Sequence, residues 1–390
     1  MLIKVFRYSA LAVFFIFGML KLPLGYTGMI MLLLLLIYGI FRERKLAWDK
    51  TSRLFGLFFL VLSGSLLLGL TQAVNTGRFF SEAEKYWGSF LIFLTAYFLM
   101  KKHLIRMSQV VKFFIGGLFV TSVLGWLRMI PHLRYLGFAD RAARLDTPLG
   151  ICNNYASVLI IGLLILLYLK KEKRTLFLPW IDWGLIIFFI FSVFFSQSDA
   201  AMLGVVVGVV MMVSMSREGF RFKRFAALLS ILILLFVTLV FVARPYFLRR
   251  GNAVRLGLWQ AYSETALKYP VTGVGLRQMR YHYNDWKRPI PFGYRETLPS
   301  MDAHNFILQY AAENGIPAAF FLLLFLGYYF SRTAGYRGRW FGLYCGLAAF
   351  LVQAFFSNNF HIIRQMMYFW FFMGLFLAEI VIYKREKRET

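Results

Sequence analysis

The residues best suited to chemistry lie in one long polar stretch, residues 244–317, of an otherwise apolar sequence. This stretch is rich in lysine and arginine, and near its end stands Asp302-Ala303-His304-Asn305, directly before a new apolar run. Histidine is the side chain whose ordinary pKa suits a general base near neutrality. A lone histidine is more often a packing or hydrogen-bonding residue, but the position of His304 at a polar–apolar boundary favours catalysis. We expect the active site here, with Asp302 or Asn305 orienting the imidazole.

A second group of candidate residues lies on a helix predicted over 255–262. Spacings of four and seven put Arg255, Trp259 and Tyr262 on one face of that helix. On the functional interpretation the arginine binds a phosphate and a sugar lies on the indole ring. The alternative is a surface helix whose aromatic side chains rest on lipid headgroups. Glu313 is about half a turn out of phase with His304 on a straight helix, so we expect it to be a structural residue.

Several kinds of chemistry are excluded by what the sequence lacks. The two cysteines, Cys152 and Cys345, lie in or beside apolar runs and give neither a disulfide framework nor metal-ligand spacing. Gly273-Val274-Gly275 is a lone GxG in a polar loop, which is more often a turn than a phosphate cradle. We expect no metal, no cofactor and no nucleic acid partner.

The elements that must position these residues are membrane helices. The composition is 59% hydrophobic and 19% aromatic, and the mean hydropathy is +0.63. Apolar runs near the ~20 residues that cross a bilayer recur along the whole length, without the alternation of a β-barrel. We predict an all-α, polytopic membrane protein with about twelve transmembrane helices, placed to within a few residues. They lie near Phe6–Leu22, Thr27–Phe41, Leu54–Leu70, Trp87–Leu99, Val110–Met129, Tyr155–Leu169, Leu176–Phe195, Ala200–Met215, Phe225–Val242, Ala318–Phe330, Trp340–Phe356 and Met366–Tyr383.

Loop charge predicts the orientation of these helices. Basic loops such as 42–45 and 170–174, and the tail 384–388, fall on one side, which the positive-inside rule makes the cytoplasm. Both termini share that side, and the first apolar run lacks a cleavage pattern, so we expect a retained helix. The chain then divides into helices one to nine (1–243), a long external catalytic loop carrying short helices (244–317), and helices ten to twelve with a basic tail (318–390).

The outer face carries more arginine than this rule predicts. Arg141 and Arg144 lie in the external loop 131–149, and the 244–317 stretch adds others, including Arg277. One explanation is that a loop longer than about 60 residues is translocated regardless of its charge, although this suits the shorter loop less well. The other is a common anionic ligand, because arginine favours bidentate phosphate recognition.

Ionisable side chains are scarce in the middle of the predicted spans. Asp182 and Glu379 lie nearer to span ends than to midpoints. Ion-coupled transporters keep ionisable residues at mid-membrane to carry their coupling ion. The pattern therefore argues against transport.

The order and spacing of the motifs in the polar stretch are fairly specific. They are Arg255-x3-Trp259, then Pro270-x2-Gly273-x-Gly275, then His304-Asn305-x2-Leu308-x4-Glu313-x-Gly315. Together they resemble the signature of the O-antigen ligase and O-antigen polymerase superfamily, and Pro148 to Ala156 resembles a further motif of it. With the helix count and the outer loop, the resemblance covers nearly the whole chain, but it separates the members of the superfamily poorly.

The resemblance implies a metal-independent, inverting glycosyltransferase that moves a glycan from undecaprenyl diphosphate onto a sugar hydroxyl. It places the essential arginine of the family on Arg255 and the essential histidine on His304, which we take as the catalytic residues. To substrate binding we assign Arg141, Arg144, Trp259, Asn305, Arg277 and Asp302. We expect the active site on the periplasmic face of a bacterial inner membrane.

One position departs from the family. Where the family usually has arginine, between the seventh and eighth spans, this chain has Asp199. A carboxylate would repel a diphosphate. Either Arg141 or Arg144 replaces the missing arginine, or activity is reduced.

Among the possible activities we favour an O-antigen ligase that uses a lipid A–core acceptor, because the outer stretch is compact. The alternative is a polymerase that binds a second lipid-linked glycan as acceptor. A further alternative is a non-enzymatic lipid-glycan carrier or flippase, which would use the arginines for binding and need no base. A protein O-glycosyltransferase is also possible, although no added soluble domain is present. The expected partners are the undecaprenyl-diphosphate-linked glycan, its acceptor and membrane lipids.

Overall fold

A computed structural model describes residues 2–20, 24–43, 48–136, 145–215, 250–282, 302–336 and 338–389. Over these ranges the chain is all-helical, and its only β-type pairing is an isolated bridge between Thr147 and Gly150. The expected all-α fold class is therefore confirmed for these residues. Arg141, Arg144 and the expected span 225–242 lie outside the described residues.

The first part of the chain forms long helices joined by short loops. They are α1 (Leu2–Ala12) with a π-helical continuation (Val13–Phe17), α2 (Leu24–Glu43), α3 (Lys50–Leu68) with a 3₁₀ continuation (Gly69–Gln72), α4 (Thr76–Lys101), α5 (Met107–Leu136), α6 (Cys152–Lys171), α7 (Pro179–Phe195) and α8 (Asp199–Met215).

The second part interleaves short and long helices. They are α11 (Arg250–Lys268), α12 (Met279–His282), α13 (Phe306–Asn314), α14 (Ile316–Thr333), α15 (Phe341–Ala354), the 3₁₀ helix η5 (Asn359–His361) and α16 (Ile363–Glu389). Every expected span other than 225–242 falls on one of the helices of the two parts. Five of the described helices are long and apolar enough to cross a membrane, so the number of about twelve spans stays a prediction.

Side-chain caps set where several helices begin. The Asp49 carboxylate accepts a hydrogen bond from the Ser52 backbone N–H at 2.8 Å, and the Ser52 hydroxyl accepts one from the Asp49 N–H at 3.0 Å, which is a capping box. Asn75 caps α4 by accepting from the Arg78 N–H at 2.9 Å. Because of this cap, α4 starts well before the expected Trp87 and brings further polar residues into the bundle.

The core of the bundle is aromatic and closely packed. Trp370 of α16 lies at its centre, with ring centroids 5.8, 5.5 and 5.4 Å from Phe59, Phe90 and Phe325. α16 packs along α4, where a Cβ on Gly374 would stand 2.2 Å from the Phe93 carbonyl oxygen. Small residues at such contacts let helix backbones approach closely, as is usual between membrane helices.

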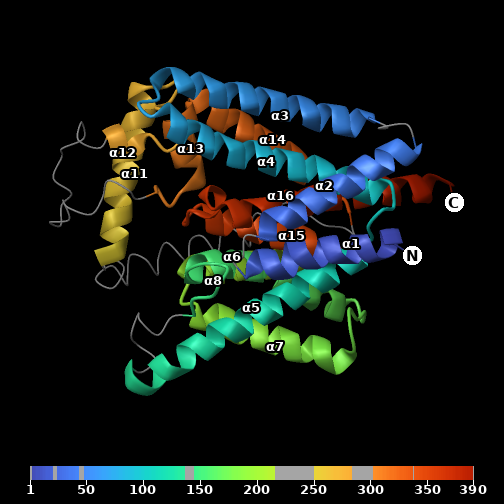
Figure 1. Cartoon of the computed structure of the whole chain (residues 1–390). Coiled ribbons are helices and arrows are strands. Elements are labelled where there is room, and N and C mark those ends of the chain that lie inside the picture. The colour runs from blue at the N-terminus through green and yellow to red at the C-terminus, as the bar shows by residue number, and fades with distance from the viewer. Residues whose placement is uncertain are drawn as a thin grey trace.

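The polar stretch gathers at one end of this bundle. α11, α12 and α13 lie together at the end opposite to the two termini, and α11 crosses that end instead of running along the bundle (Figure 1). Since α14 follows α13 directly, α13 is held at the boundary between this polar end and the apolar helices.

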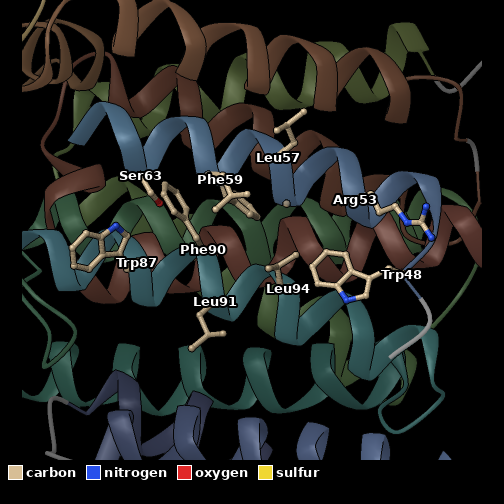
Figure 2. A pocket seen from close by; sticks show the side chains of 11 residues that line it. Trp48, Arg53, Leu57, Phe59, Ser63, Trp87, Phe90, Leu91 and Leu94 are labelled. Carbon is tan, nitrogen blue, oxygen red and sulfur yellow. The ribbon is translucent and has the colours of Figure 1, made fainter. Parts of the chain in front are cut away.

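A groove of about 620 Å³ runs between α3 and α4 on the side of the bundle (Figure 2). It is lined by Trp48, Arg53, Gly56, Leu57, Phe59, Leu60, Ser63, Trp87, Phe90, Leu91 and Leu94. No residue expected to carry chemistry lines it, so we treat it separately from the candidate site.

Candidate functional site

His304 lies at the turn that starts α13. The next residue, Asn305, caps this helix by accepting a hydrogen bond from the Leu308 backbone N–H at 3.0 Å. This cap forces the chain to turn sharply, and His304 adopts a left-handed φ of 52°. Such a backbone costs a non-glycine residue on the order of 1–3 kcal/mol and recurs at active sites. Asn305, which we expected to bind substrate, therefore has a structural role as the N-cap of α13.

The predicted helix 255–262 is the central part of α11 and packs against α13. The indole N–H of Trp259 donates to the carbonyl of Ala303 at 2.8 Å, and Tyr262 is buried. This face therefore meets protein, contrary to the alternative in which its aromatic side chains rest on lipid headgroups. The contact also places Trp259 directly beside the residue that precedes His304.

The environment of His304 keeps its imidazole neutral. Burial and the nearby positive charge of Arg255 lower the pKa of His304 to about 4. The Nδ1 atom is buried and has no hydrogen-bond partner. Among the described residues, no hydrogen bond joins Asp302 or Asn305 to the imidazole, so the expected orienting role stays a prediction. Both are occupied elsewhere, Asn305 by the helix cap.

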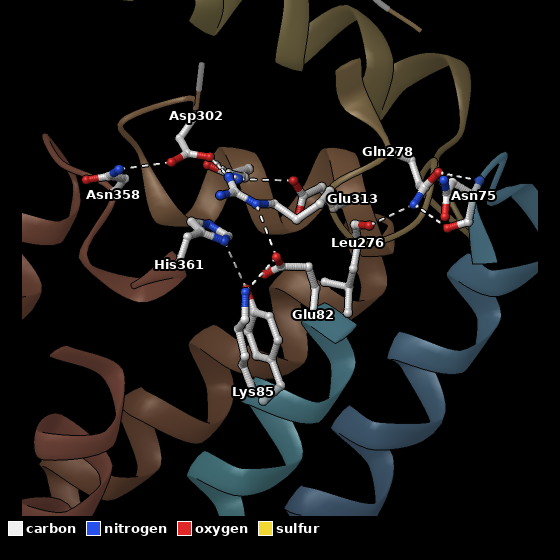
Figure 3. Close-up of polar contacts among 12 residues, drawn as sticks. Asn75, Glu82, Lys85, Leu276, Gln278, Asp302, Glu313, Asn358 and His361 are labelled. Carbon is white, nitrogen blue, oxygen red and sulfur yellow. Dashed lines mark hydrogen bonds and ion pairs between the residues drawn. The ribbon is translucent and has the colours of Figure 1, made fainter. Parts of the chain in front are cut away.

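Asp302 is the centre of a polar network instead (Figure 3). Its carboxylate pairs with the guanidinium of Arg277 and accepts hydrogen bonds from the amides of Asn358 at 2.9 Å and Gln309 at 3.4 Å. Arg277 also has a left-handed φ, 58°, and its Nε lies 3.8 Å from Glu82. Arg277, expected to bind substrate, is thus held by two carboxylates in this structure.

Gln309 and Glu313 extend the network along α13. The Gln309 side chain accepts from the Ala303 backbone N–H at 3.1 Å and donates to Glu313 at 3.0 Å. Burial raises the pKa of Glu313 to about 7, against the opposing effect of Arg277. Glu313 has no hydrogen bond to His304, which agrees with the structural role expected from its phase on the helix.

α4 and η5 contribute further polar residues to the site, and no sequence pattern indicates them. Lys85 pairs with Glu82 at 2.6 Å, and the Tyr86 hydroxyl lies 3.2 Å from Nδ1 of His361. Burial lowers the pKa of His361, and the charges of Arg277 and Lys85 lower it further. No local motif marks these residues, because only the packing of α4 and η5 against α13 brings them here.

The Gly273-Val274-Gly275 turn anchors this assembly, as expected for a lone GxG. Both glycines have positive φ, and the N–H groups of Val274 and Gly275 donate to the carbonyls of Ala312 and Glu313 at 3.0 and 2.8 Å. A Cβ on Gly273 would stand 2.3 Å from the Glu313 carbonyl carbon. Only glycine permits so close an approach, which docks the turn onto the end of α13.

Asp199 is the exposed first residue of α8. The preceding Ser198 accepts a weak hydrogen bond from the Ala201 N–H at 3.3 Å. A carboxylate in the first turn of a helix interacts favourably with the helix dipole. This gives Asp199 a local role that is independent of any ligand.

A comparison with known families covers the region that holds most of this site. Residues 183–323 match the O-antigen ligase family. This part of the chain is similar to the O-antigen ligase family. The resemblance noted in the motifs is thereby confirmed. A search among curated proteins gave no matching relative.

The matched region, residues 183–323, contains Arg255, Trp259, Arg277 and the 302–315 segment. α4 and η5, which supply Glu82, Lys85, Tyr86 and His361, lie outside it. Chemically, the arrangement offers a neutral imidazole next to an arginine, on a turn fixed by several hydrogen bonds. The neutral imidazole can accept a proton, and the arginine can stabilise negative charge on a neighbouring group.

Proposed function

We propose that the protein is an inverting, metal-independent glycosyltransferase that transfers a glycan from undecaprenyl diphosphate to a sugar hydroxyl of lipid A–core. The observation that carries the proposal is a neutral His304 that lies close enough to Arg255 to feel its positive charge. With its pKa lowered to about 4, the imidazole is in the basic form at neutral pH. A base and an arginine side by side are the two groups that such a transfer needs.

In the proposed reaction the oxygen of the acceptor hydroxyl attacks the anomeric carbon of the donor. The bond from that carbon to the diphosphate oxygen breaks on the opposite face, so the configuration inverts and the bonding pair leaves with the diphosphate. The hydroxyl proton passes to His304. Since Nδ1 is buried, Nε2 is the nitrogen that would accept it. The diphosphate is a stable anion and needs no proton in order to leave.

Arg255 has the complementary role in this proposal. Its guanidinium stabilises the charge that grows on the leaving diphosphate. Trp259, one turn further along α11 and bonded to Ala303, offers a ring face for a sugar of the donor or acceptor. Arg141 and Arg144 remain candidates for a second diphosphate contact. Arg277 and Asp302 act in the proposal by holding the turn that carries His304.

The ligase proposal is tested by supplying substrates one at a time. Purified protein receives an undecaprenyl-diphosphate glycan alone, and then the same donor with lipid A–core. We expect product only when lipid A–core is present, and no loss of activity in the presence of a chelator. A ladder of lengthening lipid-linked glycans from donor alone would make the protein a polymerase.

A non-enzymatic carrier is the remaining competitor. It would bind the lipid-linked glycan through the arginines but would need no base. Transport of a lipid-linked glycan across vesicles by a His304→Gln variant at the wild-type rate, without any transfer product from the wild type, would favour the carrier.

A further inference from the structure

The groove between α3 and α4 is built differently from the candidate site. Its inner surface is formed by the buried rings of Phe59 and Phe90, and Leu57 and Leu60 on its rim are 58% and 71% exposed. Only 28% of the apolar window of α3 is buried inside the molecule. The groove is thus an apolar channel that opens sideways, where a membrane helix meets lipid.

One end of the groove is rigid. Trp48 stands edge-on against Phe98, with ring centroids 5.4 Å apart, and a Cβ on Gly56 would lie only 3.1 Å from the Trp48 ring. The neighbouring Asp49 caps α3 and pairs with Lys101 at 2.9 Å. These contacts fix an indole ring at the mouth of the groove, at the end of the bundle away from α11–α13 (Figure 2).

The same end carries a positive charge. Arg53 lines the groove and is exposed, and within the described part of the chain it has no ion pair. Asp49, the acidic residue closest to it along the chain, is already bound by Lys101 and by the Tyr97 hydroxyl at 2.7 Å. An arginine beside a tryptophan at the mouth of an apolar groove is complementary to a phosphate with a hydrocarbon chain attached.

The dimensions match one acyl chain. Ser63 and Arg53, at the two ends, are ten residues apart on a helix, or about 15 Å. That is about half of the ~30 Å hydrocarbon thickness of a bilayer, so the groove has the length of one leaflet. Its volume of about 620 Å³ is roughly twenty times the ~30 Å³ of one water molecule, and a methylene group is of similar size.

We propose that this groove binds one anionic phospholipid, with its phosphate at Arg53 and one acyl chain along Leu57, Phe59 and Leu60. The lipid comes from the leaflet at the end of the bundle that holds the termini. It is therefore distinct from any lipid-linked substrate that reacts at His304. Its binding closes the gap that α3 and α4 leave on the surface of the bundle.

The test measures which lipids stay with the whole protein. Protein reconstituted in equimolar phosphatidylglycerol and phosphatidylethanolamine is extracted in mild detergent, and its retained lipids are counted by native mass spectrometry. We expect the wild type to keep phosphatidylglycerol in preference. Arg53→Gln should lower the ratio of phosphatidylglycerol to phosphatidylethanolamine roughly fivefold, the effect of one cation at the surface. Lys50→Gln, on the same helix but outside the groove, should leave the ratio unchanged.

A second pair of variants tests the part of the groove that we propose holds the acyl chain. Leu57→Trp fills the groove and should reduce the total lipid retained, whereas Leu67→Trp, also at an exposed leucine of α3, should not. An unchanged lipid ratio in Arg53→Gln would overturn the headgroup assignment. Equal lipid retention by the two tryptophan variants would overturn the groove as the site. A polyprenyl lipid that is bound after extraction from native membranes, whether or not Arg53 is present, would replace the proposed occupant.

Discussion

At the scale of single residues, His304 concentrates the unusual features of the molecule. Its backbone is left-handed, its Nδ1 is buried without a partner, and its pKa is far below the ordinary value. Each of these features costs stability, and a packing histidine would gain nothing from them. Such a loss of stability is expected if function requires a neutral imidazole that accepts a proton near the cationic Arg255.

The first prediction is a pH profile. His304 must be neutral to act as a base, and its pKa of about 4 lies below the unperturbed value of about 6.5. The transfer rate should therefore rise with pH through about 4 and stay level from 6 to 8, instead of rising through 6–7 as an unperturbed histidine would. Steady-state rates from pH 3.5 to 8 measure this.

The matching variants separate chemistry from binding. His304→Ala should abolish transfer while donor binding stays near the wild-type value, and His282→Ala should keep both. Full transfer by His304→Ala would exclude the base role. A limb in the wild-type profile near pH 7 that is absent from Glu313→Gln would report Glu313, whose pKa is raised to about 7 by burial.

The second prediction concerns Arg255. Arg255→Lys keeps the charge but loses the planar fork, so it should cost about 1–3 kcal/mol of transition-state stabilisation. The expected result is a fall in kcat/KM of roughly 5- to 150-fold. Arg280→Lys on α12 serves as the matched control and should match the wild type. If Arg255→Lys also matched it, Arg255 would be an ordinary headgroup contact.

At the scale of elements, α13 is a short helix fixed from several sides. The 273–275 turn binds its end, Trp259 of α11 binds its start, and Phe360 of η5 stacks on its Phe306 at 4.6 Å. The polar network of Asp302 and Gln309 lies between these supports. Precision at His304 therefore comes from the surrounding elements and not from α13 itself, which is too short to be stable alone.

The third prediction concerns the buried acid of α13. A folded-state pKa of about 7 against 4.5 means that Glu313 keeps its proton on folding, so its ionisation opposes folding above pH 4.5. Wild-type stability should fall as pH rises from 5 to 8, by about 3 kcal/mol at most. Glu313→Gln should flatten that dependence in thermal unfolding.

Glu264→Gln is its matched control. Glu264 also accepts a hydrogen bond from a glutamine four residues earlier, at 3.0 Å, but lies on the exposed side of α11. This variant should keep the wild-type dependence of Tm on pH. If Glu313→Gln also kept it, Glu313 would be ionised in the folded protein.

The fourth prediction concerns the start of α8. Asp199→Arg introduces the residue that the resemblance leads us to expect at this position and should increase donor binding or turnover, while losing roughly 0.3–1 kcal/mol of helix-dipole stabilisation. Donor affinity and turnover measure the first effect, and Tm measures the second. Ala200→Arg adds the same charge one position later and controls for charge alone. A fall in turnover for Asp199→Arg would mean that the diphosphate is held by Arg141 or Arg144.

At the scale of the whole molecule, the bundle separates a polar end from the end that holds both termini. The same separation distinguishes the candidate site from the proposed phospholipid site. The candidate site lies among α11, α13 and η5. The proposed phospholipid site begins at Arg53, near the start of α3, at the opposite end of the bundle. The two lipid sites would therefore draw on different leaflets.

The fifth prediction tests that sidedness. Both native cysteines are buried, so cysteines introduced at Leu267 and Lys387 report their own surroundings. A membrane-impermeant maleimide should label Leu267→Cys from the periplasmic face and Lys387→Cys only when the cytoplasmic face is opened. Labelling of both from one face would refute the predicted orientation.

The sequence by itself determined the features that depend on local pattern. Apolar runs of membrane length gave the helices, because backbone groups in lipid must be satisfied within the helix. A spacing of four residues put Arg255 and Trp259 on one face of α11, and the GxG pattern marked the turn at 273–275, where both glycines have positive φ. His304 could be selected because its motif is contiguous.

Only the tertiary structure decided what surrounds His304. Glu82, Tyr86, Asn358 and His361 stand far away in the sequence, and they reach the site because α4 and η5 lie against α13. The surroundings of Asp302 have the same origin, since Arg277 and Asn358 both contact its carboxylate. The neutral state of His304 also depends on burial and on a charge from another helix, which no local pattern encodes.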